Sequence, residues 1–170
     1  MGTDGTPVLM PSGHPLPPVD PRTVSSTASL ALSGRPESVR RARDFTRETL
    51  RAWRLPQQCE PVGLVVSELV TNALRHGLRA LPPVPRAVPV PMPPETRTRT
   101  VGLELMRCAG RLVCAVQDPS GHAPRVGELD GATESGRGLR LVECFSDGWG
   151  WRPLTGGQQG KIVWAVFGTA

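Results

Sequence analysis

The stretch from Cys59 to Leu78, CEPVGLVVSELVTNALRHGL, constrains the fold more than any other part of the chain. Its apolar side chains recur at helical intervals, which is typical of a helix with one buried face. The members of this apolar face are Leu64, Val65, Leu69, Ala73 and Leu74. We therefore predict a helix across this stretch that packs on a core.

Three polar residues, Glu68, Asn72 and His76, interrupt the apolar pattern of this helix. Each lies four positions after the previous one, so their side chains are expected on one stripe of the helix. Polar groups that are buried need partners. The stripe is therefore either a solvated face with local hydrogen bonds or a face that meets a ligand or a metal, and the helix alone does not distinguish these two interpretations.

The length and charge of the chain exclude few functions. The chain has 170 residues, a formal net charge of +5 and a pI near 9.8, and this length suffices for one domain with its own core. Of the 20 basic residues only Lys161 is a lysine, and tyrosine is absent, a bias typical of a high-GC bacterium. Because the arginines are spread along the chain without aromatic stacking residues, a nucleic-acid partner is not expected. A basic nucleic-acid binder remains an alternative that rests on the pI alone.

The sequence favours a cytoplasmic protein without a membrane partner. No apolar run is long enough to span a bilayer, and the N-terminus lacks the charged start and apolar core of a secretory signal. The cysteines show neither C-x-x-C spacing nor histidines at zinc-finger intervals, so we expect free, buried thiols. They are Cys59, Cys108, Cys114 and Cys144.

Two segments are rich in proline: residues 1–26 and residues 81–98. We expect the first to be a disordered tail rich in Pro, Gly, Ser and Thr. The second is too long and too rich in proline for a tight connection, and is interpreted as an insertion into the domain. The folded domain is then expected at residues 27–168.

The remaining patterns predict the order β-α-α-β-β-loop-α-β-β. The expected strands are 27–33, 100–106, 112–117, 148–152 and 161–167, the expected helices are 36–55, 59–78 and 138–144, and the loop is 122–136. Hairpin connections indicate a mostly antiparallel mixed sheet, which helices cover on one face. The fold class is therefore α+β, a two-layer α/β sandwich whose second sheet face is solvated or used by a partner.

Three motifs then follow one another along the chain. They are Glu68-x-x-x-Asn72-Ala73-x-x-His76, Asp118-Pro119-Ser120-Gly121 and Gly136-Arg137-Gly138-Leu139. In this order they resemble the GHKL-type ATP-binding domain shared by DNA gyrase, MutL and sensor histidine kinases. The small size and the final GKIVWAVF strand are most similar to the bacterial anti-sigma-factor serine/threonine kinases. The resemblance covers about residues 27–168 and implies a Bergerat-type fold that binds ATP and Mg²⁺.

The resemblance implies a role for each motif. Asn72 matches the asparagine that holds magnesium, an ion that prefers oxygen ligands, and Glu68 matches the proposed catalytic base. Asp118 matches the aspartate that reads the amino group of adenine, beside Gly121, where the backbone approaches the base. The Gly136–Leu139 turn, which opens a helix, matches the phosphate-binding segment.

Four further residues keep more than one interpretation. His76 either contacts the phosphates or lies at the helix end, where a cation is favoured. Arg137 either adds positive charge to the phosphates or faces solvent, and Lys161 is either part of the family-like final strand or a surface lysine. Glu134 departs from the family pattern, since another glycine often stands there, and a negative charge near a triphosphate opposes binding unless it points away.

The predicted activity is transfer of the terminal phosphate of MgATP to a serine or threonine of a partner, an anti-sigma-factor antagonist. The alternative is a non-catalytic nucleotide-binding module that sequesters a sigma factor or another partner. A histidine-kinase fragment ranks lower, because no helix pair with a phospho-accepting histidine precedes the domain. One face of the 36–55 helix carries Arg40, Arg41, Arg43, Arg47 and Arg51. It is either a solvated face or a surface for an acidic partner. The sequence is compatible with a homodimer and does not determine the oligomeric state.

Overall fold

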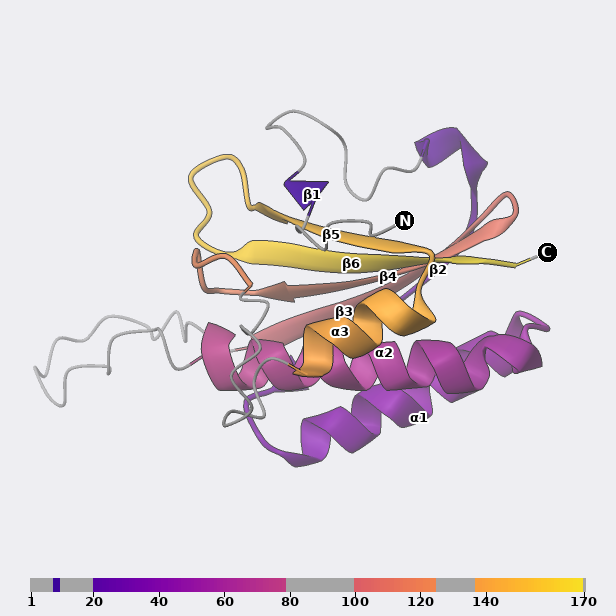
Figure 1. The fold of residues 1–170 in the computed structure, drawn as a ribbon, viewed down its shortest axis with the longest axis horizontal. Helices are drawn as coiled ribbons and strands as arrows, with labels where there is room; N and C mark the ends of the chain where they lie inside the picture. Colours follow the sequence, from indigo (N-terminus) through magenta and orange to yellow (C-terminus); the bar gives the residue numbers. More distant parts are fainter. Residues whose placement is uncertain (1–7, 10–19, 79–99, 125–136, 170) are drawn as a thin grey trace, which may run out of the picture.

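The protein folds into a sheet layer and a helix layer (Figure 1). The computed structural model describes residues 8–9, 20–78, 100–124 and 137–169. The helices are α1 (Glu37–Ala52), α2 (Cys59–Asn72) and α3 (Arg137–Phe145), and the strands are β1 (Val8–Leu9), β2 (Val24–Ser33), β3 (Thr100–Cys108), β4 (Arg111–Asp118), β5 (Gly148–Pro153) and β6 (Lys161–Gly168). All three helices lie on one side of the sheet in Figure 1, which confirms the predicted α+β sandwich.

The six strands are arranged in the order β1-β5-β6-β4-β3-β2. The two residues of β1 pair in parallel with β5, and every other pair is antiparallel. The β3–β4 hairpin turns at Ala109–Gly110, and Gly110 has a φ of 68° there, a conformation that suits glycine. Strands β4 and β6 are neighbours at the centre of the sheet. Their antiparallel register sets Asp118, the last residue of β4, opposite Lys161, the first residue of β6.

The structure differs from the predicted disordered tail at the described residues of 1–26. Val8–Leu9 form β1, Pro21–Thr23 form a short 3-10 helix, η1, and β2 begins at Val24. The earlier start of β2 follows from the length of β3, since Val24 finds its strand partner in Cys108. The insertion predicted at 81–98 lies outside the described residues.

The main core lies between the sheet and the helices. Helix α2 contributes most to it, because it packs against both α1 and α3 as well as the sheet. Its buried apolar residues are Cys59, Val62, Val65, Val66, Leu69 and Val70. Burial on nearly all sides explains why this helix has so few polar residues, and it makes α2 a fixed platform for the polar residues that it does carry. None of the helices in the described ranges has the length and apolar character needed to cross a membrane.

The sheet face away from the helices is not simply solvated. It carries a second apolar cluster that includes Met106, Val113, Ala115 and Trp164. Trp164 is only 3% exposed and lies against Gly150, its partner on β5, where an added Cβ would be 2.7 Å from the indole ring. Of the two expectations for this face, a solvated surface does not hold at this cluster.

The predicted helix at 59–78 changes its geometry near its end. The α-helix ends at Asn72, and Ala73–Gly77 continue it as a π-helix, η3. The amide of Leu78 donates to the carbonyl of Ala73 at 3.2 Å, five residues back. Wider turns of this kind are rare and occur often at functional sites.

Candidate functional site

Glu68 and Asn72 meet the beginning of α3. Both side chains are partly buried, and they lie one turn apart on α2. Gly138, the second residue of α3, is buried against them: an added Cβ would lie 2.6 Å from Glu68 Oε2 and 3.5 Å from Asn72 Nδ2. Glycine permits this close approach, because any Cβ here would have to push the end of the Glu68 side chain aside. Two of the three sequence motifs are thus brought together.

The end of the same helical segment reaches the third motif. Gly77 closes η3 and is buried against Asp118, the last residue of β4. An added Cβ at Gly77 would lie 2.5 Å from Asp118 Cγ. The φ of Gly77 is not positive, so the left-handed conformation of a glycine helix cap does not explain this residue. The reason for glycine here is the approach of the aspartate side chain.

Asp118 is a buried carboxylate with two donor groups. The residue is only 3% exposed. The backbone N–H of Ser120 donates to Oδ1 at 2.8 Å, and Lys161 Nζ lies 3.1 Å from both Oδ1 and Oδ2. The hydroxyl of Ser120 in turn accepts from the N–H of His122 at 3.2 Å. These bonds fix the Asp-Pro-Ser turn and hold the carboxylate in one orientation.

The environment acts on the charge of Asp118 in opposite directions. Burial raises the pKa of the Asp118 carboxyl above its ordinary value. The nearby charge of Lys161, the hydrogen bonds from Ser120 and Lys161, and the charge of His76 lower the pKa but only partly offset burial. A buried carboxylate with a raised pKa is a frequent feature of functional sites.

Lys161 belongs to this cluster around Asp118, which decides against the surface lysine that the sequence left open for this position. It is only 5% exposed and is the cross-strand partner of Asp118 at the end of the β4–β6 ladder. Its neighbour Gly160 has a φ of 140°, and an added Cβ there would lie 2.5 Å from the Asp118 carbonyl oxygen. A signal was present in the sequence: an acid ends one apolar strand and a base begins another, so antiparallel pairing brings the two charges together.

The other predicted site residues are placed as follows. Gly121 is exposed, with nothing within 4 Å of an added Cβ, which leaves room beside the backbone. His76 is exposed and acts electrostatically on Asp118. Arg137 begins α3, and Leu139 is only 1% exposed, so its side chain belongs to the core. Gly136 and Glu134 lie outside the described residues.

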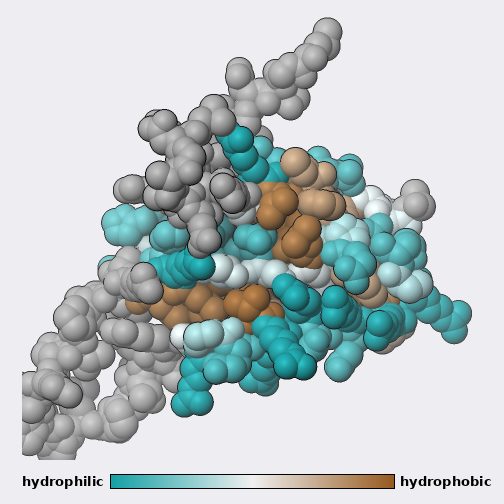
Figure 2. Space-filling view, turned by 60° about the horizontal axis from the view of Figure 1, so that its bottom comes forward, coloured by the Kyte–Doolittle hydropathy of each residue, from teal (hydrophilic) through white to brown (hydrophobic). Residues whose placement is uncertain are grey.

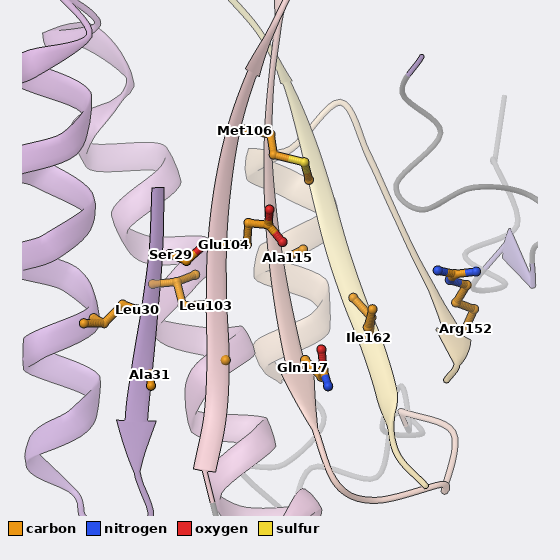
Figure 3. A pocket seen from close by; sticks show the side chains of 11 residues that line it. Ser29, Leu30, Ala31, Leu103, Glu104, Met106, Ala115, Gln117, Arg152 and Ile162 are labelled. Carbon is orange, nitrogen blue, oxygen red and sulfur yellow. The ribbon is translucent and has the colours of Figure 1, made fainter. Parts of the chain in front are cut away.

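A hollow separate from these residues lies on the helix-free face of the sheet (Figure 3). It has a volume of about 380 Å³. Its polar lining includes Glu104, Gln117 and Arg152, and Met106 and Ile162 supply apolar surface. Gln117 precedes Asp118 in β4 and therefore points to the opposite face of the sheet. The hollow is thus separate from the site built by Glu68, Asn72 and Asp118.

The arginines of α1 are less free than the sequence suggests. Arg43 Nε donates to Ser67 Oγ on α2 at 3.0 Å, and Arg47 pairs with Glu60 on the same helix at 3.5 Å. Figure 2 shows the helical side of the molecule, where hydrophilic residues cover most of the described surface. The exposed arginines that remain on α1 are Arg40, Arg41 and Arg51. Two of the five arginines therefore hold α1 against α2.

Three of the four cysteines fit the expectation of free, buried thiols, and Cys144 differs from it by being exposed. Cys59, Cys108 and Cys114 are free and buried, whereas Cys144 on α3 is free and exposed. Burial raises the pKa of the Cys108 thiol and raises that of Cys114 to about 12. Burial thus favours the protonated, unreactive form of the Cys108 and Cys114 thiols.

The comparison with protein families agrees with this geometry. The family model of the histidine kinase-like ATPase domain matches residues 32–167, which is more than half of the 170-residue chain. A search of curated proteins found no match. The matched region contains both ends of the site, from Glu68 and Asn72 to Asp118. The chain therefore belongs to the histidine kinase-like ATPase domain family, whose module is one that binds ATP.

Proposed function

We propose that this protein transfers the terminal phosphate of MgATP to a serine or threonine of a partner protein, in the manner of the anti-sigma-factor kinases. The observation that carries the proposal is the contact of Gly138 with Glu68 and Asn72. It places a carboxylate, an amide and the first turn of a helix at one point. These are the groups that a phosphoryl-transfer site needs.

The base-binding end of the site fits adenine. Asp118 is fixed, buried and bonded to Ser120 and Lys161, so its carboxylate is oriented before any ligand arrives. A carboxylate accepts hydrogen bonds, which suits the exocyclic amino group of adenine. The open space beside Gly121 leaves room for a flat base next to the backbone.

The phosphate end fits a magnesium triphosphate. Within the described ranges, no group of three His, Cys, Asp or Glu side chains could hold a metal ion. Magnesium commonly takes few protein ligands and completes its shell with phosphate oxygens and water, so the Asn72 carbonyl oxygen is a sufficient protein ligand. The N-terminus of α3 adds backbone N–H groups and a favourable dipole for phosphate.

Glu68 is the proposed base. It is partly exposed, which leaves its carboxylate accessible to a hydroxyl group from a partner. In the proposed reaction the hydroxyl oxygen bonds to the terminal phosphorus, the bond to the bridging oxygen breaks, ADP leaves and Glu68 accepts the hydroxyl proton. The partner is proposed to be an anti-sigma-factor antagonist, with the exposed arginines of α1 as a docking surface for acidic residues.

Nucleotide binding is the first test of the proposal. Isothermal titration of the purified protein with ATP and magnesium should show binding, and Asn72→Ala should reduce the magnesium-dependent part of the affinity. Gln117→Ala is the matched control, because Gln117 is exposed on the opposite sheet face. An unchanged affinity of Asn72→Ala for MgATP would argue against the assigned role of Asn72.

Phosphate transfer is the second test. Partners captured from the source cell are incubated with the protein and γ-labelled ATP, and label on a serine or threonine is expected. Glu68→Gln should bind ATP normally but transfer more slowly, by about 100-fold or more. Glu60→Gln is the control, since Glu60 is exposed on the same helix and pairs only with Arg47 in the described contacts. If Glu68→Gln regulates the partner as well as the wild type, the protein is a non-catalytic module.

A further inference from the structure

The ion pair between Asp118 and Lys161 differs from the other ion pairs of the described residues. Arg40–Asp44 and Arg47–Glu60 are solvent-exposed, and pairs of that kind contribute little to stability. Asp118 and Lys161 are 3% and 5% exposed, and Lys161 Nζ contacts both carboxylate oxygens at 3.1 Å. A buried lysine that contacts the proposed base-reading group needs a reason, because its desolvation is costly.

We propose that Lys161 is a positioning residue for base recognition: it keeps the Asp118 carboxylate ionised and oriented, so that the site accepts a purine with an exocyclic amino group and disfavours one with a carbonyl there. This inference rests on the proposed ATP-binding function. It assigns to the chain's single lysine a role in choosing the nucleotide.

The hydrogen-bond capacity of Asp118 supports this role. An ionised carboxylate offers about four acceptor positions and no donor. Oδ1 accepts from Ser120 N–H and from Lys161 Nζ, whereas Oδ2 lies 3.1 Å from Lys161 Nζ as the other oxygen of the ion pair, so Oδ2 keeps capacity for a further donor. An amino group can use it, whereas a carbonyl oxygen at the same place would meet a negative charge.

A protonated Asp118 would lose this selectivity. One oxygen would then donate a hydrogen bond, and a carbonyl would become an acceptable partner. Burial pushes the carboxyl toward protonation, as its raised pKa shows, and three groups oppose burial: Lys161 on β6, His76 on η3 and the backbone N–H of Ser120. Lys161 is first among the opposing charges and contacts the carboxylate directly.

The sign of the pH effect follows from these groups. Without the charge of Lys161, the pKa of Asp118 rises further, so at neutral pH a larger fraction of the carboxyl is protonated and the amino group of ATP loses its acceptor. Raising the pH restores the carboxylate and the affinity. The wild type, in which Lys161 is present, should bind ATP with little change over the same pH range.

The test compares wild type with Lys161→Gln, which keeps an N–H donor but removes the charge. Affinities for ATP and for ITP, which has a carbonyl in place of the amino group, are measured by titration from about pH 6 to about pH 9. For Lys161→Gln at the lower pH we expect ATP binding about 10- to 100-fold weaker, with a lost preference for ATP over ITP. Both should recover at the higher pH. Arg111→Met, which removes an exposed charge at the other end of β4, should leave both affinities unchanged.

Two outcomes would overturn the inference. One is that Lys161→Gln shows the same pH dependence of ATP affinity, and the same preference for ATP over ITP, as the wild type. The other is an equal loss of both nucleotides at every pH, which would indicate a purely structural role.

A second measurement needs no nucleotide. The ¹³C signal of the Asp118 carboxyl should titrate at a higher pH in Lys161→Gln than in wild type, with Lys161→Met as the replacement variant should the first fail to fold. The same titration in both proteins would contradict the proposal. If wild-type protein binds no ATP, the proposed function fails, while this titration still decides whether Lys161 keeps Asp118 ionised.

Discussion

Gly77 and Asp118 approach so closely that an added Cβ at position 77 would lie 2.5 Å from the carboxylate carbon. The contact joins the end of the helical segment that carries Asn72 to the end of a central strand. It therefore couples the proposed base-reading residue to the proposed magnesium ligand through one continuous piece of backbone. Any side chain at position 77 has to displace one of these elements.

Gly77→Ala should therefore weaken both the fold and the site. The Cβ would also lie 2.7 Å from Asp118 Oδ1, and Asp118 is held by Ser120 and Lys161, so it cannot easily move. Overpacking of this kind typically costs about 1–3 kcal/mol. We expect a lower free energy of unfolding in denaturant titration and weaker ATP binding. Gly148→Ala is the control, because an added Cβ there meets nothing within 4 Å, and an equal loss in both variants would contradict the explanation.

Gly138→Ala should affect function more than stability. The added Cβ would meet the end of the Glu68 side chain at 2.6 Å, and that side chain can rotate away at low cost. Alanine is also a better helix residue than glycine by about 1 kcal/mol. We expect a melting temperature close to that of the wild type but slower phosphate transfer, because Glu68 is displaced. A large drop in melting temperature would show that neither Glu68 nor α3 can move to accommodate the added Cβ.

The order of elements could be predicted from local sequence patterns, because helical spacing and strand ends are local signals. The spacing also singled out Glu68 and Asn72, but the roles expected of Glu68, Asn72 and Asp118 came from the resemblance of the ordered motifs to an ATP-binding family, since an Asp-Pro at a strand end is by itself most simply a turn. The change to a π-helix at Ala73 could not be predicted, because nothing in the periodicity marks where the backbone widens. Its effect is to place Gly77 against Asp118, which depends on packing between distant segments.

The role of Lys161 shows why a single-residue interpretation fails for buried pairs. Taken alone, a lysine at the start of a strand is most simply a surface residue. Its burial depends on the register of β4 and β6, which sets it opposite Asp118. The second apolar cluster around Trp164 is a similar case, since an aromatic residue on one strand needs a glycine, Gly150, on the next. Such features can be predicted only once it is known which strands pair and in which register.

Thiol labelling should distinguish Cys144 from the other cysteines. It is exposed, whereas Cys59, Cys108 and Cys114 are buried. Alkylation of the native protein at about pH 8 should modify one thiol, because the thiolate is the reactive form. Denatured protein should take up label at all four cysteines, and Cys144→Ser should remove the native label. Rapid labelling of native Cys144→Ser would show that the core opens more readily than the structure implies.

The raised thiol pKa values also predict a dependence of stability on alkaline pH. The pKa of Cys114 is about 12 in the fold, against 9.0 for an ordinary thiol. The stability contributed by the protonated thiol is therefore fully present below the ordinary value and is lost as the pH rises toward the folded-state pKa. The free energy of unfolding of the wild type should fall above pH 9.0. The free energy of unfolding of Cys114→Ala should fall less steeply over the same pH range. Equal slopes would contradict this source of the pH dependence.

The buried pair of Asp118 and Lys161 should show strong coupling in a double-mutant cycle. Removing one partner of such a pair leaves a buried, uncompensated charge and typically costs about 3–5 kcal/mol. Lys161→Met alone should therefore be strongly destabilising near neutral pH. Asp118→Leu, with a side chain of similar shape, should lose a comparable amount, since it leaves the lysine without its counter-charge and Ser120 N–H without an acceptor. The double variant should be much more stable than the sum of the two losses predicts, because neither charge remains.

The pH dependence of the Lys161→Met defect provides an independent check of this cycle. The pKa of Asp118 is raised in the fold, so the protonated carboxyl is the form that the buried site favours, and stability is lost as the pH rises through that pKa. Without Lys161 this loss becomes larger. The destabilisation by Lys161→Met should thus be smaller at about pH 4 than at about pH 7, since a protonated carboxyl needs no counter-charge. Chemical denaturation at the two pH values measures the difference, and a defect that is the same at both would show that lost packing of the lysine stem, and not its charge, accounts for the effect.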